Sequence, residues 1–381
     1  MTEYAGISAT LPPGWRVVPL GSLAHVSYGI VQPGADVAGG VPIVRVRDLK
    51  QGRIDTGRPL RVRADIDAAY ARTRLAGGEV LLTLVGSVGQ AAVVPAALAG
   101  WNVARAVAVL RPARPLPPRW LTRCLAGEFV RHCIAAWLNT TVQATLNLAD
   151  VRRLPIVLPP APERESITAL LDCLDAKIAG NERLAGTALR LAGAQFQAAG
   201  QGGRSAVLGD VVDLGYGRAL PAARRRPGAV PVYGSAGPSG WHDEALVPGP
   251  GIVVGRKGTV GAVHWSAGDF FPIDTTYYVR CPAGVPLEYA YFLLRSLGLS
   301  AMNSDSAVPG LNRSSTLSLP IRLAGGPEME LFARRSRTLF ALRDRLARET
   351  QALRDLRDYL MPRLMSGRLR PGPADVRRAD V

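Results

Sequence analysis

The feature that most restricts how this chain can fold is an internal repeat. Short motifs recur in the same order in the two halves of the 381-residue sequence. The matched pairs are Leu20-Gly21-Ser22 with Leu208-Gly209-Asp210, Tyr28-Gly29 with Tyr216-Gly217, Val41-Pro42 with Val230-Pro231, Val88-Gly89 with Val260-Gly261, Leu146-Asn147 with Leu311-Asn312, and Leu154-Pro155-Ile156 with Leu319-Pro320-Ile321. Chance explains one or two such matches but not a collinear series, so we expect both halves to fold on one plan.

Each half leads into a long segment with the spacing of an amphipathic helix. The first runs from Pro162 to Ala199 and the second from about Pro327 to Met361, and both open with Pro-Glu. These residues suit a helix start, where the missing N–H of proline costs nothing and the backbone dipole favours an acidic group. At about 1.5 Å per residue each helix would be roughly 50 Å long, which is longer than one compact domain needs.

The second helix carries a heptad pattern. Its leucines keep a three-then-four spacing at Leu339, Leu342, Leu346, Leu353, Leu356 and Leu360, with Glu349 in the slot between Leu346 and Leu353. Such a seam is buried by pairing with another helix, and the first helix is the nearest partner. We expect the helix-pair interface to bury Leu342, Leu346, Leu353 and Leu356 against Leu170, Leu174 and Ile178.

Between the repeated motifs the sequence predicts short strands interrupted by glycine and proline. The expected strands are His25–Ile30, Val41–Arg47, Glu79–Val85, Ala91–Val94, Val103–Leu110, Val230–Tyr233, Gly251–Gly255, Gly261–Trp265 and Thr275–Arg280, and the expected short helices are Leu116–Leu138 and Leu287–Leu297. The fold class is therefore α+β, with two mixed α/β domains in a pseudo-two-fold repeat, separated by two long helices. The domains are expected at residues 1–160 and 201–325, the helices at 161–200 and 326–370, and a disordered tail at 371–381.

The charge balance indicates a polyanionic partner. The formal net charge is +16, and only three of the 46 basic residues are lysines, namely Lys50, Lys177 and Lys257. A GC-rich genome accounts for arginine in place of lysine, but not for the excess of basic over acidic residues. Nucleic acid is the first candidate partner, and a merely basic, solvated surface is the alternative.

The sequence also predicts the compartment. No apolar run approaches the length of a membrane span, and the first residues show no signal-peptide pattern. The four cysteines form no Cys-x-x-Cys pair. A reduced, cytoplasmic protein with no membrane segment is the expectation.

The search for catalytic motifs finds none. The chain has no Gly-x-x-x-x-Gly-Lys-Ser/Thr phosphate loop, no Asn/Asp-Pro-Pro-Tyr stretch for amino-methyl transfer, and no Gly-x-Gly-x-x-Gly after a strand. Cys124, His132 and Cys133 share one predicted helix but lack a fourth zinc ligand. Nuclease-like Asp-x-Lys occurs at residues 48–50 and 175–177, and a bare tripeptide is weak evidence. The sequence therefore predicts binding without catalysis, and no metal or cofactor in this chain.

The candidate binding residues lie in polar, glycine-flanked loops between the predicted strands. If residues 41–47 form a strand, Arg45 and Arg47 project from one face, because side chains alternate. The turn at residues 86–89 brings backbone N–H groups near a phosphate, and residues 255–259 form the same turn with two cations added; 233–235 and 240–242 form another glycine-rich loop. Arginine suits both phosphates and guanine edges. The predicted DNA contacts are Arg45, Arg47, Lys50, Arg53, Gly86, Ser87, Arg218, Gly234, Ser235, Arg256, Lys257 and Thr259, and the alternative is that they are ordinary hairpin tips.

Six stretches have a recognisable pattern, namely LPPGWRVVPLGSL near the start, LPIVLPPAPERESI before the first long helix, VPVYGSAGPSG, GIVVGRKGTVGAV and IDTTYYV in the second half, and LRDLRDYLMPRLMSGRL near the end. In these stretches the chain resembles a known family, the specificity (S) subunits of type I DNA restriction–modification systems. Each stretch alone is only weakly specific for the family, but the order of the stretches and their occurrence in both halves are strongly specific. The resemblance covers nearly the whole chain. One departure is that the second half has no equivalent of Trp15.

The resemblance implies a non-catalytic subunit with two target-recognition domains, each reading one half of a split double-stranded DNA site. The two long helices would pair antiparallel as a coiled-coil spacer and dock two modification (M) subunits, which bind S-adenosylmethionine and methylate adenine. Restriction (R) subunits with ATP-driven translocation and nuclease activity would complete the complex. S-adenosylmethionine, ATP and Mg²⁺ are thus expected in the partner subunits.

Two alternatives remain open. One is the specificity subunit of a methylation-only or other phage-defence system, which would have the same DNA-binding chemistry and no restriction partner. The other is a self-contained DNA-acting enzyme with an unrecognised site, which would methylate or cleave DNA as the purified chain when given a methyl donor, ATP and Mg²⁺.

Overall fold

The computed structural model describes residues 11–50, 52–113, 116–138, 145–200, 203–302 and 310–371. Residues 1–10, where the sequence shows no signal-peptide pattern, and residues 372–381 of the predicted tail lie outside these ranges. The described chain is a mixed α+β protein that divides into two compact units. Unit 1 comprises Met1–Lys177 with Leu353–Val381, and unit 2 comprises Ile178–Ala352.

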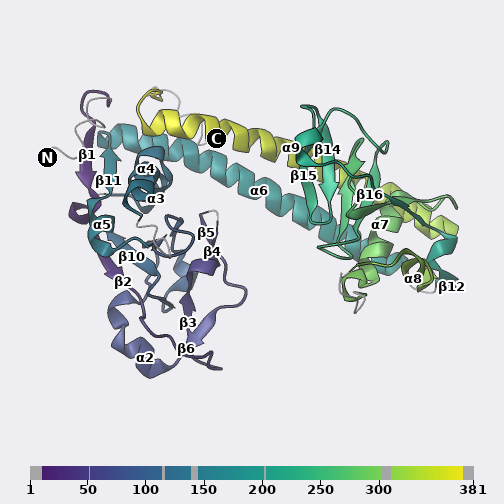
Figure 1. Cartoon of the computed structure of the whole chain (residues 1–381), viewed down its shortest axis with the longest axis horizontal. Coiled ribbons are helices and arrows are strands. Elements are labelled where there is room, and N and C mark those ends of the chain that lie inside the picture. Colours follow the sequence, from purple (N-terminus) through teal and green to yellow (C-terminus); the bar gives the residue numbers. More distant parts are fainter. Residues whose placement is uncertain are drawn as a thin grey trace. The chain divides into compact units, whose positions relative to one another are not determined.

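Both long helices are present, and each contributes to both units. Helix α6 spans Ala161–Ala199 with 39 residues, and helix α9 spans Gly326–Met365 with 40 residues (Figure 1). At 1.5 Å per residue each is about 60 Å long. The predicted helices at 162–199 and 327–361 are therefore confirmed, with α9 one turn longer at its end.

Unit 1 contains small sheets with the strand orders β2-β10-β7-β8, β6-β3-β9, β1-β11 and β4-β5. In Figure 1, β3, β6 and α2 lie at the opposite end of this unit from β1 and β11. The strands are β1 (Arg16–Pro19), β2 (Ala24–Tyr28), β3 (Val41–Val44), β4 (Leu49–Lys50), β5 (Arg53–Ile54), β6 (Leu60–Val62), β7 (Val80–Thr83), β8 (Ala91–Val93), β9 (Asn102–Val103), β10 (Val107–Pro112) and β11 (Pro155–Leu158). The short helices are α2 (Ala64–Ala69), α3 (Pro118–Ala126), α4 (Glu128–Trp137) and α5 (Leu148–Arg153).

Unit 2 has sheets with the strand orders β13-β19-β16-β17, β15-β14-β18 and β12-β20. Its strands are β12 (Arg204–Val207), β13 (Asp213–Tyr216), β14 (Val230–Gly234), β15 (Gly237–His242), β16 (Gly251–Gly255), β17 (Val263–Ser266), β18 (Phe271–Pro272), β19 (Thr276–Arg280) and β20 (Pro320–Leu323). Its short helices are α7 (Leu287–Ser296) and α8 (Arg313–Leu317).

The two units share one topology, which agrees with the repeat in the sequence. Each has a four-stranded antiparallel sheet, a two-stranded sheet that joins its first and last strands, and a three-stranded sheet with one parallel pair, β3 with β9 or β14 with β18. The repeated Leu-Asn motif has one role in both units. Asn147 and Asn312 cap α5 and α8, with side-chain oxygens that accept from the N–H of Asp150 at 2.9 Å and of Ser315 at 3.0 Å.

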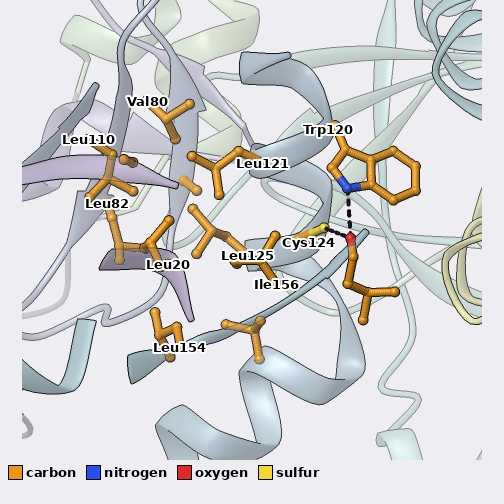
Figure 2. Packing of buried hydrophobic residues seen from close by; sticks show 14 of the residues in the cluster. Leu20, Val80, Leu82, Leu110, Trp120, Leu121, Cys124, Leu125, Leu154 and Ile156 are labelled. Carbon is orange, nitrogen blue, oxygen red and sulfur yellow. Dashed lines mark hydrogen bonds between the residues drawn. The ribbon is translucent and has the colours of Figure 1, made fainter. Parts of the chain in front are cut away.

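The main core of unit 1 lies between its four-stranded sheet, helix α3 and strand β11 (Figure 2). Trp120 of α3 is fully buried, and its Nε1 donates to the carbonyl oxygen of Val157 at 2.9 Å. In unit 2 the fully buried ring of Tyr289 in α7 packs at 5.0 Å from Phe196 of α6, and its hydroxyl accepts from the N–H of Ala324 at 3.1 Å. Each core therefore joins its sheet to part of a long helix.

The predicted single helix at Leu116–Leu138 is wrong in one respect. Gly127 has an extended backbone, with φ −71° and ψ 160°, and separates α3 from α4. Glycine loses the most conformational freedom in a helix, so the chain turns there at little cost.

The long helices bury a heptad seam whose register differs from the predicted one. In α9 one series of buried or half-buried positions is Leu346, Thr350, Leu353, Arg357, Leu360 and Leu364. In α6 the corresponding series is Ile167, Leu171, Leu174, Ile178, Asn181, Ala185, Ala188 and Ala192. Both sets keep strict three-then-four spacing, so Thr350, not Glu349, occupies the slot between Leu346 and Leu353.

This register corrects part of the predicted helix-pair interface. Ile178 and Leu346 are buried, and Leu174, Leu342 and Leu353 are half-buried. Leu170 and Leu356 are 37% and 45% exposed, so the prediction that they are buried is wrong. Each lies one position before a seam residue, Leu171 or Arg357, and a one-residue step turns a side chain by about 100° around the helix.

Candidate nucleic-acid interface

Arg45 is a structural residue, not part of a strand face. Strand β3 ends at Val44, and Asp48 draws the chain into a short 3-10 helix (Val46–Asp48). Arg45 Nε and Nη2 donate to the Asp48 carboxylate at 2.8 and 3.0 Å, and Nη2 also donates to the Arg58 carbonyl oxygen at 2.7 Å. The prediction that Arg45 and Arg47 project from one strand face is therefore wrong, because this bidentate ion pair bends the chain.

The other predicted cations of unit 1 are exposed. The side chain of Arg47 is 71% exposed, and its Nε lies 3.8 Å from the Asp48 carboxylate. Lys50 and Arg53 face each other across the β4–β5 hairpin. A Cβ added at Gly52, at the tip of that hairpin, would lie 4.0 Å from the carbonyl oxygen of Ala91, which opens β8. The hairpin tip is thus beside the end of the loop that carries Gly86 and Ser87.

The turn at Gly86 and Ser87 has the same geometry as its counterpart in unit 2. Gly86 and Gly258 have φ of +72° and +79°, a region that favours glycine. Both turns close with equivalent backbone hydrogen bonds. In unit 1 the N–H of Val88 donates to Gly86 O at 2.8 Å and the N–H of Gly89 to Thr83 O at 3.0 Å. In unit 2 the N–H of Val260 donates to Gly258 O at 3.0 Å and the N–H of Gly261 to Gly255 O at 2.8 Å. The sequence match between the two turns therefore reflects one local structure.

In unit 2 the predicted loop residues Ser235 and Thr259 lie together, whereas Gly234 is the last residue of β14 and pairs with Gly237 of β15. The N–H of Thr259 donates to Ser235 Oγ at 3.3 Å, and His264 Nε2 lies 2.9 Å from the Ser235 carbonyl oxygen. The predicted glycine-rich loop at 240–242 is wrong, because these residues belong to β15 and pair in register with Val230–Val232 of β14. Ladder hydrogen bonds with β14 outweigh the low strand propensity of glycine there.

Arg256, Lys257 and Arg218 lie at the same end of the sheet in unit 2. The Arg256 guanidinium carbon lies 5.1 Å from the ring centre of Tyr216, and its Nη1 donates to the Asp274 carbonyl oxygen at 3.2 Å. Lys257 is exposed. The N–H of Arg218 donates to the Pro272 carbonyl oxygen at 3.0 Å, which places Arg218 beside the turn that leads into β19.

Two exposed aromatic residues were missed by the sequence reasoning. Tyr216 ends β13 and is 55% exposed, and Trp241 lies on the edge strand β15 and is 59% exposed. Arg225 donates from Nη1 to the carbonyl oxygen of Ser239, two residues before Trp241, at 2.6 Å. The ring of Tyr216 lies beside the Arg256 guanidinium, and an aromatic ring beside arginine is typical of surfaces that bind nucleic acids. The available signal was the recurrence of Tyr28-Gly29 as Tyr216-Gly217, which marks the end of this strand in both halves.

Other arginines of unit 2 are neutralised by carboxylates. Arg226 pairs with Asp243 and Glu244 at 2.7 Å each. Asp213 of β13 pairs with Arg280 at 2.5 Å and with Arg313 of α8. Desolvation raises the pKa of Asp213, but hydrogen bonds from Arg313 and Arg280 outweigh it and hold that pKa below its usual value.

Replacing Asp213 by Asn should therefore lower the stability of unit 2 in a pH-dependent way. Because the folded-state pKa lies below the unfolded value of about 3.9, the ion pairs contribute fully above that value. Their contribution is lost as the pH falls through the folded-state pKa. We expect the difference in unfolding free energy between the wild type and Asp213→Asn to shrink as the pH falls from about 6 to 3 in urea titrations.

Glu330→Gln is the control for this measurement. Glu330 is exposed on α9 and makes no hydrogen bond or ion pair with the described part of the chain. Its replacement should leave the unfolding free energy nearly unchanged at each pH. An Asp213→Asn effect that is constant from pH 6 to 3 would show that the ion pairs do not stabilise the fold through their charge.

Within the described ranges, no group of three or more His, Cys, Asp or Glu side chains is placed to hold a metal ion. Burial raises the pKa of the Cys124 thiol to about 12. No helix in the described ranges combines the length and apolar character needed to cross a membrane.

Comparisons with known proteins bear on these observations. No family model matches the chain. It is 27% identical over 192 residues to the specificity subunit of the type I restriction enzyme EcoBI from Escherichia coli. The aligned region covers 49% of this chain and 40% of that subunit. It is 26% identical over 115 residues to the specificity subunit of the type I restriction enzyme EcoprrI, also from Escherichia coli, which covers 29% of each. The matches thus span less than half the length of these relatives.

The fold is similar to that of a solved structure. The S subunit of the type I restriction–modification system from M. genitalium superposes with a TM-score of 0.59 at 16% identity, covering 92% of this chain and 96% of that one. At this identity the likeness concerns the fold. The resemblance that the sequence indicates is thus confirmed, and this chain is a homologue of type I restriction enzyme specificity subunits over about half its length and has the fold of such a subunit.

Proposed function

We propose that this chain is the DNA-binding specificity subunit of a type I restriction–modification complex. Each unit binds one half of a bipartite double-stranded target through the loops at the end of its four-stranded sheet. The chain supplies recognition and no catalysis, whereas methylation and cleavage are performed by modification and restriction subunits that bind S-adenosylmethionine, ATP and Mg²⁺.

This proposal rests on one observation. The two units have the same topology, but they carry different residues at equivalent loop positions. The carbonyl oxygen of Leu84 accepts from the N–H of Leu146 at 2.9 Å, and that of Arg256 accepts from the N–H of Leu311 at 2.8 Å, so Leu84 and Arg256 are equivalent. One residue is a buried leucine and the other a half-buried cation. A repeated framework with unlike loops suits a protein that reads two unlike half-sites.

The long helices support a spacer and docking role. Their strict heptad seams are typical of an antiparallel coiled coil in a pseudo-two-fold molecule. Outside the seams both helices expose large apolar side chains, namely Leu170, Leu184, Leu191, Leu331, Leu356 and Tyr359. We assign these side chains to contacts with two modification subunits. Leu170 and Leu356, which the sequence predicted to lie in the helix-pair interface, are thus assigned to the docking surface.

Exchanging residues 204–325 for those of a relative tests the proposal. The expected result is a new sequence at one half-site of the methylated target, with the other half-site and the gap unchanged. The physical reason is that the loops of each unit contact only their own half-site. The methylated sequences in a host that carries the exchanged chain, read by single-molecule sequencing, report this directly.

The reciprocal exchange of residues 11–158 is the matched control, and it should alter the other half-site only. A change in both half-sites after either exchange would contradict the two-module proposal. Absence of methylation by the wild-type complex, with methylation by the purified chain alone, would contradict the non-catalytic role.

A further inference from the structure

Arg256 is held in one orientation by its surroundings. Its guanidinium carbon lies 5.1 Å from the ring centre of Tyr216 and 5.9 Å from that of Tyr277, and the two rings meet edge to face at 5.2 Å. Tyr277 is 2% exposed, and its hydroxyl donates to the Leu311 carbonyl oxygen at 3.0 Å. The Arg256 backbone is also fixed, because its N–H donates to the Thr275 carbonyl oxygen at 2.9 Å.

The charge of this guanidinium remains available for a ligand. Nη1 donates to the Asp274 carbonyl oxygen at 3.2 Å, and the guanidinium also has a hydrogen-bonding interaction with the Tyr277 side chain. Neither contact is an ion pair. Arg45, by contrast, uses Nε and Nη2 for its bidentate pair with Asp48. No carboxylate pairs with Arg256 in the part of the chain that the structure describes. The guanidinium of Arg256 is therefore ordered, and its charge is not paired with a carboxylate of the described residues.

The fold does not require a cation at this position. In unit 1 the equivalent residue is Leu84, which is 1% exposed and forms the same turn. Strand pairing also makes Tyr277 equivalent to Ala108, since they lie opposite Tyr216 and Tyr28. Unit 2 thus has Arg256 and Tyr277 where unit 1 has Leu84 and Ala108. Because unit 1 forms the same turn without them, a role in ligand binding accounts for these two residues better than a role in folding.

We propose that Arg256, oriented by Tyr216, makes a bidentate contact with O6 and N7 of one guanine in the half-site read by unit 2. This inference rests on the proposed function. A guanidinium held beside aromatic rings can present two parallel donors to the paired acceptors of a guanine edge in the major groove. Tyr216 is a positioning residue, and the neighbouring Lys257, which is exposed, contacts phosphate. The equivalent place in unit 1, where Leu84 is buried, contributes no such contact.

The test uses the specificity subunit assembled with its modification subunits and a library of randomised DNA duplexes. The wild-type complex should select one guanine that Arg256→Gln and Arg256→Leu no longer select. Discrimination at that base pair should fall by roughly 5- to 150-fold, the range that one bidentate contact supplies, while the other positions are unchanged. Arg256→Leu introduces the residue found in unit 1, so the turn is expected to form, and circular dichroism checks this.

Further variants separate base reading from phosphate contact. Lys257→Gln should weaken binding to all duplexes alike and lower the slope of log affinity against log salt by about 0.9. Tyr216→Phe should keep the guanine preference because the ring remains, whereas Tyr216→Ala should reduce it. Replacing the selected guanine by 7-deazaguanine should weaken wild-type binding but leave binding by Arg256→Gln unchanged, since N7 is one of the two acceptors.

The outcomes are distinguishable. If the wild-type complex selects a bipartite site and Arg256→Gln lowers affinity equally for all duplexes, Arg256 contacts phosphate and the inference is overturned. An unchanged selection profile in Arg256→Gln overturns it as well, and both results leave the proposed function intact. Failure of the wild-type complex to select any bipartite site would overturn the proposed function itself.

Discussion

Raising the salt concentration from 50 to 200 mM should weaken DNA binding by the assembled complex about 10³–10⁵-fold, the range for a protein that contacts about 6 to 10 phosphates. The formal net charge of the chain is +16. Exposed cations that lie in the candidate loops, such as Arg47, Lys50, Arg218 and Lys257, would displace counterions from the DNA. Fluorescence anisotropy with a labelled duplex, titrated at several salt concentrations, gives the slope.

Two controls accompany this measurement. The urea midpoint of the free chain should change little over the same salt range, which separates loss of binding from loss of fold. A duplex without the target sequence should show a slope of similar size at lower affinity, because phosphate contacts carry no sequence information. If the affinity for the target duplex did not change with salt concentration, DNA would not be the ligand that the positive charge of this chain binds.

Trp120→Ala should destabilise unit 1 by about 3–5 kcal/mol, the cost of removing a large aromatic side chain from a packed core. Trp120 is 0% exposed, and Figure 2 shows its indole nitrogen and the Cys124 sulfur directed at the same oxygen atom. Its Nε1 is also the donor for the carbonyl oxygen of Val157 at 2.9 Å. Urea unfolding followed by circular dichroism, with hydrogen exchange to assign the transition to unit 1, measures the loss.

Trp241→Ala is the matched control, because Trp241 is 59% exposed and its removal leaves no cavity. Its effect on stability should stay within about 0.5 kcal/mol. Trp120→Phe keeps most of the volume and removes the indole donor. A cost of about 1 kcal/mol is expected for the lost hydrogen bond, because Cys124 Sγ still donates to the Val157 carbonyl oxygen at 3.7 Å. A Trp120→Ala effect as small as that of Trp241→Ala would mean that unit 1 is not organised around this core.

The long helices show how far periodicity alone can go. Apolar spacing and Pro-Glu openings predicted both helices almost to their ends, because these signals depend only on neighbours along the chain. The register of the seam was not predictable in the same way. Leucine occurs at Leu342, Leu346, Leu353 and Leu356, and two of these positions flank the buried stripe, which instead contains Thr350 and Arg357. Arg357 donates to Asp175 of α6 at 3.3 Å, a partner that no local pattern reveals.

The sequence by itself determined the doubled plan, the strands that the repeated motifs mark, the long helices and the resemblance to specificity subunits. It did so because repetition and periodicity are properties of residue order. The tertiary structure alone decided which cations are available to a ligand. Arg45 and Arg256 look alike in the sequence, since each comes directly after a short apolar run, residues 41–44 and 251–255. A carboxylate three residues away pairs with Arg45. Tyr216, forty residues before Arg256, lies beside the second guanidinium, and no carboxylate of the described residues pairs with it. The Arg45 pair is local, but the surroundings of Arg256 come from segments that are distant in the sequence, and they exist only once the sheet has formed.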